Sequence, residues 1–234
     1  MELTIWCARA IKTVLAEVGA EFECSSGCKL NVVSDPGLQS AYIKRLQAGE
    51  TFDVFVFPPG LIDTWIKEGK IVAETRTPIV RAGIGVAVRT GAPKPDVSTV
   101  DAFKRALLAA KSIAYLNVGA SGVQVADMLK RIGIADAIAS KLARPEADMV
   151  SQMVATDEIE LGLVIATQIL TTPGVDLAGM LPAELQSYVT FVGGVSTGSA
   201  VPDASRALIR FLTGPVCLPV IKAQGMEPEN MTEK

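Results

Sequence analysis

Histidine is absent from the 234-residue sequence. Its absence excludes Ser-His-Asp and Cys-His nucleophilic sites, and it excludes zinc or iron sites that depend on histidine ligands. Cysteine is scarce as well: the chain has four, Cys7, Cys24, Cys28 and Cys217. Four scattered cysteines are too few for a disulfide scaffold in a chain of this length. Much of the common repertoire of enzyme chemistry is therefore unavailable to this protein.

The cysteine spacing leaves two interpretations open. Cys24 and Cys28 could form a small bridge in an oxidising compartment or remain two free thiols in a reducing one. A tetrahedral metal site would require Cys7 and Cys217 to join them without the usual close pairs, so we expect no metal site. The sequence also has no nucleotide-binding fingerprint and no Walker lysine, so we expect no cofactor.

Charge of either sign is modest. The net charge is −3, with 20% charged and 49% hydrophobic residues, which is typical of globular proteins and argues against disorder and against a nucleic-acid partner. No apolar run reaches the roughly 18 residues of a membrane span, so we expect no membrane insertion. The first residues, Met1 to Trp6, read directly as a strand. We expect a periplasmic location if a leader was removed, and a cytoplasmic one otherwise.

What is present is an alternation of short apolar runs with stretches that are apolar at i, i+3, i+4 and i+7. This alternation predicts an α/β fold. The predicted strands are 3–7, 30–33, 53–57, 84–88, 113–116, 161–165 and 189–192, the last being the final strand. A terminal helix carries Ala204, Leu208, Phe211 and Leu212, and Gly193-Gly194 reads as a hinge or turn. Only 227–234 looks disordered.

The same pattern predicts two βα lobes, the second inserted into the first. We place residues 1–80 plus 193–234 in lobe 1 and residues 81–192 in lobe 2. The two crossovers are expected near 78–83 and 190–194.

Small and hydroxyl residues follow four of the predicted strands. In open α/β sheets, ligands bind beyond the carboxyl ends of the strands, where helix N-termini present backbone N–H groups. The candidate ligand-binding residues at these ends are Arg9, Ala10, Ser34, Asp35, Pro36, Ala120, Ser121, Gly122, Ala166 and Thr167. Together they predict a site for a small anion.

Individual candidates also have structural interpretations. Arg9 has a planar guanidinium group that suits a carboxylate or phosphate, but it could also be a surface arginine at the start of a helix. Asp35 and Ser121 suit helix N-caps. If the protein is an enzyme, Asp35 and Cys7 are the candidate bases, although Cys7 also reads as a buried structural cysteine.

Two strand-and-helix segments carry a resemblance to a known family. The stretch from Leu46 to Val56, with Gly49-Glu50 and Phe52-Asp53-Val54, is followed by the run from Arg81 to Pro93; the segments 207–212 and 221–226 add to the likeness. The chain resembles the bacterial extracellular solute-binding family that includes the molybdate-binding proteins of ABC transporters. The resemblance implies a two-lobed type 2 periplasmic-binding fold, with a ligand cleft between lobes joined by two crossovers, and closure by a hinge motion.

The resemblance also implies a function. A solute-binding protein of an ABC-type transporter captures a small anion and passes it to a permease. Family members that bind molybdate place serines at the first two helix starts and a tyrosine after a late strand. This chain instead has Ala10 beside Arg9, Asp35 or Pro36 next to Ser34, and Ile165 or Ala166. We therefore expect an organic carboxylate rather than molybdate.

An enzyme interpretation stands beside the first. An aconitate isomerase is similar to this family, so the alternative is a cytoplasmic isomerase of a di- or tricarboxylic acid that acts by proton transfer. Whether the chain is an enzyme stays open at this point, with a binding protein favoured.

Overall fold

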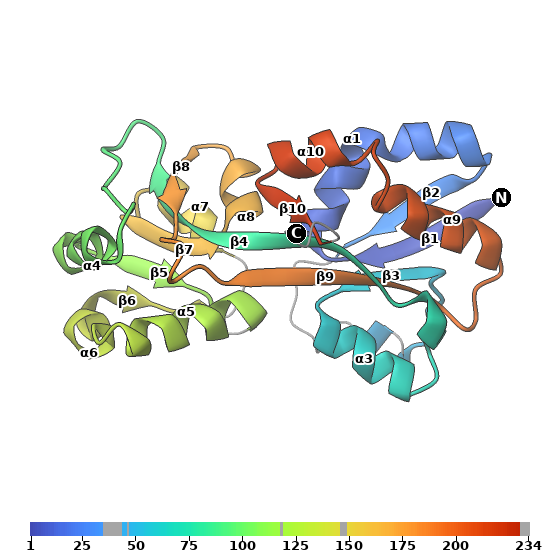
Figure 1. The fold of residues 1–234 in the computed structure, drawn as a ribbon, viewed down its shortest axis with the longest axis horizontal. Coiled ribbons are helices and arrows are strands. Elements are labelled where there is room, and N and C mark those ends of the chain that lie inside the picture. The colour runs from blue at the N-terminus through green and yellow to red at the C-terminus, as the bar shows by residue number, and fades with distance from the viewer. Residues whose placement is uncertain (35–43, 46, 118, 146–148, 230–234) are drawn as a thin grey trace. The chain divides into compact units, whose positions relative to one another are not determined.

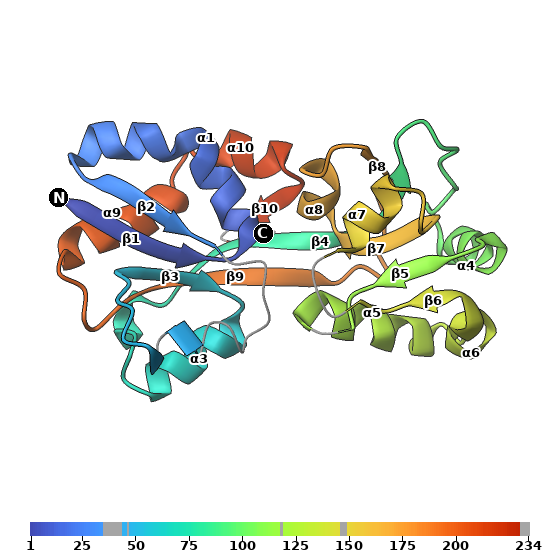
Figure 2. The same cartoon turned by 180° about the vertical axis from the view of Figure 1, so that it is seen from behind.

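In the computed structural model, residues 1–34, 44–45, 47–117, 119–145 and 149–229 are described. The chain forms two units: unit 1 comprises Met1–Arg81 and Thr190–Lys234, and unit 2 comprises Ala82–Val189. Each unit is described by itself, and Figures 1 and 2 show the elements from two sides. The strands β4 (Thr77–Arg89) and β9 (Tyr188–Val195) each carry the chain across a boundary between the units.

Unit 1 is built around β1, a short buried strand with parallel neighbours on both sides. Alternating large apolar residues in β1 pack on opposite faces of the sheet. Unit 1 contains parts of β4 and β9. Its other elements are β1 (Glu2–Cys7), α1 (Arg9–Ser26), β2 (Lys29–Val33), β3 (Val54–Phe57), α3 (Pro59–Lys67), a 3-10 turn (Ala73–Thr75), α9 (Pro202–Leu212), α10 (Leu218–Ala223) and β10 (Met226–Pro228).

Helices cover both faces of the unit 1 sheet. On one face α3 packs on an aromatic core that includes Trp6, Phe55 and Trp65. The Trp6 and Trp65 rings are stacked with centroids 6.1 Å apart. On the other face lie α1, α9 and α10 (Figures 1 and 2), where Phe22 of α1 and Phe211 of α9 are in contact. Most of the aromatic residues of the chain therefore lie in unit 1, where they stabilise its core.

Unit 2 has the same layered plan around β5 and β7. Its elements, besides the rest of β4 and the start of β9, are α4 (Val100–Ala109), β5 (Ile113–Tyr115), α5 (Gly119–Arg131), α6 (Ala135–Ile138), a 3-10 turn (Ala139–Lys141), β6 (Leu142–Ala143), α7 (Val150–Ala155), β7 (Leu161–Ile165), α8 (Ala166–Leu170) and β8 (Val175–Met180). Helices α4, α5 and α6 share one core, and α7 and α8 contribute to the core on the other face.

The predicted α/β class and two-lobed architecture are confirmed, while several element predictions were wrong. Strand β9 is not the final strand, because β10 pairs with β4. Helix α9 is not terminal, because α10 follows it. Glu227 lies in β10 rather than in a disordered end. Several short elements of unit 2, among them α6, β6, α8 and β8, had no counterpart in the prediction.

Gly193 and Gly194 do not form a turn but lie inside β9, where they pair with Val56 and Phe55. A Cβ on Gly193 would lie 2.8 Å from the Ile79 side chain, and one on Gly194 would lie 2.6 Å from Ile71. The absence of a side chain lets neighbouring apolar residues pack directly on the strand. These glycines are therefore packing residues of a regular strand.

A carboxylate ties three parts of unit 1 together. Asp53 precedes β3, and its Oδ2 accepts a hydrogen bond from the backbone N–H of Thr4 at 2.9 Å. Its Oδ1 accepts a hydrogen bond from the Ser199 hydroxyl at 2.7 Å, and Ser199 in turn lies 3.1 Å from the Ser205 hydroxyl at the start of α9. Asp53 thus links β1, β3 and the segment that leads into α9.

We expect Asp53→Ala to lower the free energy of unfolding by about 1–3 kcal/mol, because it leaves partly buried donors unpaired. Urea denaturation followed by circular dichroism measures this change. The matched control is Asp63→Ala, which removes an ion pair of 2.7 Å between partly exposed Asp63 and Arg76. Exposed ion pairs contribute little, so the control should lose less. Equal losses would contradict the role assigned to Asp53.

Candidate functional site

The exits of three parallel strands of unit 1 lie at one edge of its sheet. Strand β1 pairs in parallel with β2 and β3, with Trp6 opposite Val33 and Cys7 opposite Val56. The N–H of Ala8 continues the pairing by donating to the carbonyl of Val56 at 2.9 Å. The carboxyl ends of the three strands therefore meet at the same edge.

Two helices begin at this edge without a capping side chain. The N-cap of α1 is Ala8 and that of α3 is Pro58, and neither side chain accepts a hydrogen bond from its helix. A helix start needs acceptors for its first N–H groups and carries the positive end of the helix dipole. The 18-residue helix α1 therefore offers favourable electrostatics for an anion at this edge.

The predicted residues of unit 1 take the following positions. Arg9 is the first residue of α1 and is half-buried, and Ala10 beside it is buried. Ser34, half-buried, directly follows β2. Asp35 and Pro36 lie outside the described residues. The structure thus places Arg9, Ala10 and Ser34 at the exits of neighbouring strands.

Cys7 is the last residue of β1, and its environment suits a structural role. Its side chain is fully buried. Burial raises the pKa of the Cys7 thiol to about 12, and the charge of Lys12 offsets only part of this rise. Because the thiol stays protonated at neutral pH, it is a poor proton acceptor. This environment argues against a role for Cys7 as a base.

The carboxyl edge of unit 2 is built in the same way. Strand β5 pairs in parallel with β6 and β7, with Ala114 opposite Ala143 and Tyr115 opposite Leu163. The N–H of Asn117 donates to the carbonyl of Pro145 at 2.9 Å, which holds the segments after β5 and β6 together. Helices α5 and α8 begin at this edge.

The predicted residues of unit 2 divide into two groups, one on each helix. Ala120, Ser121 and Gly122 lie in the first turn of α5, which begins at Gly119, so Ser121 is inside the helix and is not its N-cap. A Cβ on Gly122 would collide with the backbone carbonyl of Leu116. Gly122 therefore allows α5 to approach the end of β5 closely.

Ala166 and Thr167 open α8, and Thr167 has an unusual environment. It is only 2% exposed, and its hydroxyl has no hydrogen-bond partner among the described residues. Ser151, 3% exposed in α7, shares this property. A buried unpaired hydroxyl costs about 1–3 kcal/mol, so each is a candidate donor for a ligand.

The sequence analysis did not single out Ser151, Pro58 or Arg144 as candidates. Pro58-Pro59 directly follows the apolar run of β3, and this position could have indicated the start of a helix after that strand. Arg144 follows β6, but a strand of two residues produces no periodic pattern. Ser151 lies one residue inside a six-residue helix and had no distinguishing signal.

An arginine follows one described strand in each unit. Arg9 follows β1 in unit 1, and Arg144 follows β6 in unit 2. The first three residues after β1, β3 and β7 include no acidic side chain, whereas in the sequence Asp35 follows Ser34 after β2 and Glu146 follows Pro145 after β6. These edges combine arginines with helix N-termini, which favours anions over cations.

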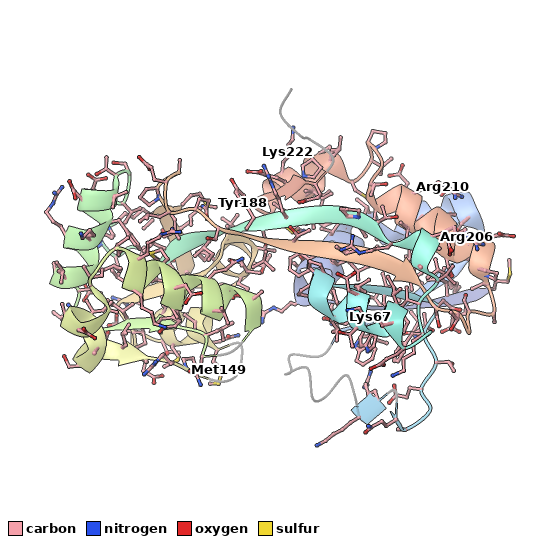
Figure 3. All side chains as sticks on the ribbon, turned by 60° about the horizontal axis from the view of Figure 1, so that its bottom comes forward. Lys67, Met149, Tyr188, Arg206, Arg210 and Lys222 are labelled. Atoms are coloured by element: carbon pink, nitrogen blue, oxygen red, sulfur yellow. The ribbon has the colours of Figure 1, made fainter. Side chains whose placement is uncertain are left out.

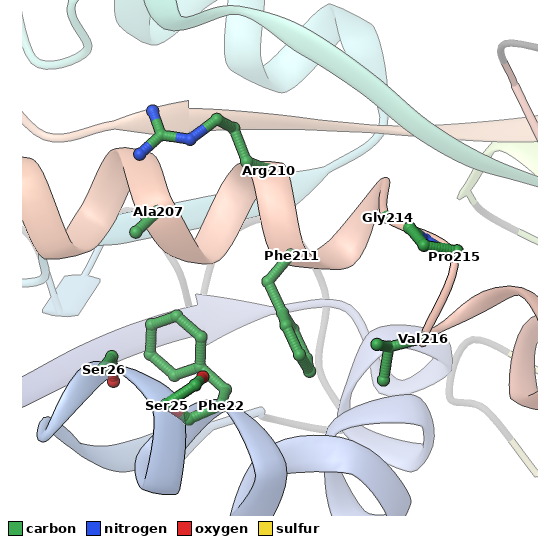
Figure 4. A pocket seen from close by; sticks show the side chains of 9 residues that line it. All are labelled: Phe22, Ser25, Ser26, Ala207, Arg210, Phe211, Gly214, Pro215 and Val216. Atoms are coloured by element: carbon green, nitrogen blue, oxygen red, sulfur yellow. The ribbon is translucent and has the colours of Figure 1, made fainter.

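A groove of about 370 Å³ lies elsewhere on unit 1, between the end of α1 and α9 (Figure 4). Phe22 and Phe211 form its apolar wall, and the Arg210 side chain points away from them. Arg206 and Arg210 are exposed along α9 (Figure 3). The groove includes none of the predicted site residues, and it is at the other end of α1 from Arg9.

All four cysteines are free thiols, with Cys24 exposed and the other three buried. Cys24 and Cys28 are therefore unbridged. Among the residues placed by the structure, no cluster of acidic or cysteine side chains is suited to holding a metal ion. In the same part of the chain, no helix is both long and apolar enough to cross a membrane.

Comparison with known proteins identifies the family. The model of the family "bacterial extracellular solute-binding protein" matches residues 3–227. The chain belongs to this family. The resemblance inferred from the sequence is thereby confirmed, including the likeness to molybdate-binding proteins.

Two relatives match almost the whole chain. An aconitate isomerase from Pseudomonas sp is 30% identical over 230 residues, covering 97% of this chain and 87% of the relative. The molybdate-binding protein ModA from Azotobacter vinelandii is 28% identical over 237 residues, covering 96% and 89%.

Solved structures share the fold. The substrate-binding domain of a putative molybdenum ABC transporter from Clostridium difficile has a TM-score of 0.77 at 18% identity, covering 97% of this chain and 98% of that one. The sulfate-binding protein SubI from Mycobacterium tuberculosis has a TM-score of 0.77 at 14% identity, covering 99% and 88%. The fold is that of solute-binding proteins, and the relatives include proteins named for anions.

The four thiols should differ sharply in reactivity. In the native protein at pH 8, we expect iodoacetamide to modify Cys24, because its side chain is exposed. Cys7 should react only after unfolding, because its side chain is buried and its pKa is raised to about 12. Peptide mass spectrometry of native and urea-unfolded samples measures both. Native modification of Cys7 at the rate of Cys24 would contradict this assignment.

Proposed function

We propose that this protein binds a small organic anion through a carboxylate group, as the solute-binding component of an ABC-type transporter. The observation that carries the proposal is the unit 1 edge, where the guanidinium-bearing Arg9 opens the uncapped helix α1. Family membership supports the transport role and an extracytoplasmic location. The partner in this role is a permease, which receives the ligand.

The type of anion follows from the donors at the edges. A guanidinium presents parallel N–H donors that match the two oxygens of a planar carboxylate. Within unit 2, the buried Thr167 hydroxyl is a separate candidate donor at the start of α8. The homologous aconitate isomerase is named for a carboxylate substrate, which also supports an organic acid. Closure of the two units by a hinge motion stays a prediction.

A second candidate function is isomerisation of a di- or tricarboxylic acid. The specific observation in its favour is the 30% identity with aconitate isomerase over nearly the whole chain. Such a reaction needs a base within hydrogen-bond reach of the reacting carbon. The protonated Cys7 thiol is unsuited to that role, so Asp35 is the candidate base for this function.

A thermal-shift panel tests the proposal. Its members are molybdate, tungstate, sulfate, phosphate, citrate, the aconitate isomers and shorter dicarboxylates. A ligand at 100 times its Kd should stabilise the protein by about 2.7 kcal/mol. We expect a response to a carboxylate. A response to molybdate or tungstate alone would overturn the carboxylate assignment and restore the oxyanion role.

The contribution of Arg9 can be measured on the same samples. Arg9→Ala should weaken binding of the responding carboxylate by about 2 kcal/mol, because it removes a charge-assisted hydrogen bond. Isothermal titration calorimetry measures the loss. Arg210→Ala is the matched control, since Arg210 is an exposed arginine of unit 1 away from the predicted site. Equal affinities for both variants would remove Arg9 from the site.

Incubation with the responding acid separates the two candidate functions. We expect no isomer to form when cis- or trans-aconitate is incubated with the protein and followed by proton NMR. Formation of the other isomer, and its loss in Asp35→Asn with binding retained, would establish the enzyme in place of the receptor.

A further inference from the structure

The groove between α1 and α9 is a feature of unit 1 alone, since every residue that lines it belongs to that unit. Its apolar wall is made by Phe22 and Phe211, whose ring centroids lie 5.4 Å apart (Figure 4). Phe22 is buried, but Phe211 is half-buried, as is Val216 in the segment that leads to α10. Part of this apolar wall therefore faces solvent.

The α9 side of the groove is basic. Arg206 and Arg210 are both exposed, and side chains four residues apart lie on the same face of a helix (Figure 3). Arg206 forms an ion pair of 3.4 Å with Asp203. Arg210 makes no hydrogen bond or ion pair within the part of the chain that the structure describes. The α9 side therefore carries a positive charge without a counter-charge.

The α1 side is acidic, because the last ten residues of α1 include three glutamates and no basic residue. Glu17 and Glu21 are exposed and four residues apart. Glu17 accepts a hydrogen bond from the neutral amide of Gln224, and Glu21 makes no hydrogen bond or ion pair among the described residues. Burial raises the pKa of the Cys217 thiol to about 11, and the charge of Glu21 adds to this rise. Glu21 therefore lies near the Val216 end of the groove.

A ridge of small side chains runs along the outer side of α1. Ala16, Ala20 and Cys24 follow one another at intervals of four residues, and all three are exposed. Glu17 and Glu21 each come one residue later, so the acidic stripe runs beside the ridge. Unit 1 therefore presents both a narrow ridge with an acidic flank and an apolar groove with a basic flank.

We propose that this face is a self-association surface, in which α1 of a second copy of this chain lies in the groove of the first. In a two-fold arrangement the same contact forms twice. Glu17 and Glu21 of each copy then face Arg206 and Arg210 of the other. Arg9 is at the opposite end of α1, so the contact leaves the strand-exit edge of unit 1 uncovered.

The strength of this association follows from its components. Exposed ion pairs contribute little and are screened by salt, and the apolar area of the groove is small. The dimer should therefore be weak, forming only in concentrated solution and less at high salt. The competing explanation is that these charges serve solubility and that no copy occupies the groove. It predicts a monomer at every concentration, as does a groove that accepts a different protein.

Sedimentation velocity of the full chain at low salt, from low micromolar to nearly millimolar protein, tests the proposal. The variants are Arg210→Glu, Glu21→Arg and the two combined. The matched control is Lys67→Glu, the same reversal at an exposed residue of α3 on the other face of the unit 1 sheet (Figure 3). A reductant prevents disulfides between exposed Cys24 thiols. Circular dichroism melting verifies that each variant is folded.

We expect the wild type and Lys67→Glu to dimerise as concentration rises. Arg210→Glu and Glu21→Arg should each raise the dimer Kd by roughly tenfold or more, because each places like charges opposite one another. An equimolar mixture of these two single variants should associate again, since both contacts then pair a glutamate with an arginine. The double variant should associate for the same reason.

Alkylation of Cys24 gives a second measurement on the wild type. Cys24 lies on the ridge that enters the groove, so iodoacetamide should modify it more slowly in concentrated than in dilute protein. The Lys67→Glu control should show the same protection, and Arg210→Glu should lose it.

Three outcomes would overturn the inference. The first is a wild type that stays monomeric over the whole range. The second is a dimer that Arg210→Glu and Glu21→Arg weaken no more than Lys67→Glu does, which would place the interface elsewhere. The third is a loss in both single variants that their mixture does not restore, which would show that these residues do not face each other. Ligand binding is measured separately, so none of these outcomes bears on the proposed function.

Discussion

Strand β1 has parallel neighbours on both sides, and so does β5. This pairing determines where the strand exits and helix starts of each unit lie. Parallel neighbours bring three strand exits to a single edge of each unit. The helices that return from these strands must then begin at the same edge, so their N–H groups and dipoles are concentrated there. An edge with helix N-termini, which favour anions, follows from the strand pairing, and in the proposed function Arg9 then selects among anions.

The two units use different means to keep these edges in place. Unit 1 packs aromatic rings around Trp6 and uses the Asp53 carboxylate to tie the strand starts to the segment before α9. Unit 2 relies on cores that are mostly aliphatic, with Phe103 and Tyr115 among them, and on close backbone approach, as at Gly122. Rigid edges matter because a charge-assisted hydrogen bond is strong only when donor and acceptor are held in line.

Much of the fold was predictable because the inner strands are apolar runs. Residues 54–57 and 161–165 are buried on both faces, so their composition identifies them directly. Gly193-Gly194 was misassigned because glycine pairs usually mark turns, and only the packing of Ile71 and Ile79 shows why the strand tolerates them. Strand β6 was not predicted because it is two residues long and has no periodicity. Asp35 and Pro36 were predicted site residues that fall outside the described residues.

The alanine at the N-cap of α1 has a consequence for how the protein balances stability against binding. Serine, threonine or aspartate at such a position typically stabilises a helix by about 1 kcal/mol relative to alanine. A capping side chain at position 8 would also compete with a bound anion for the same N–H groups. Ala8 does not provide that stabilisation. In the proposed function, the bound anion instead accepts hydrogen bonds from the first N–H groups of α1. A capping residue in place of Ala8 should then make α1 more stable and the protein a poorer receptor, which is the trade-off expected at a functional site.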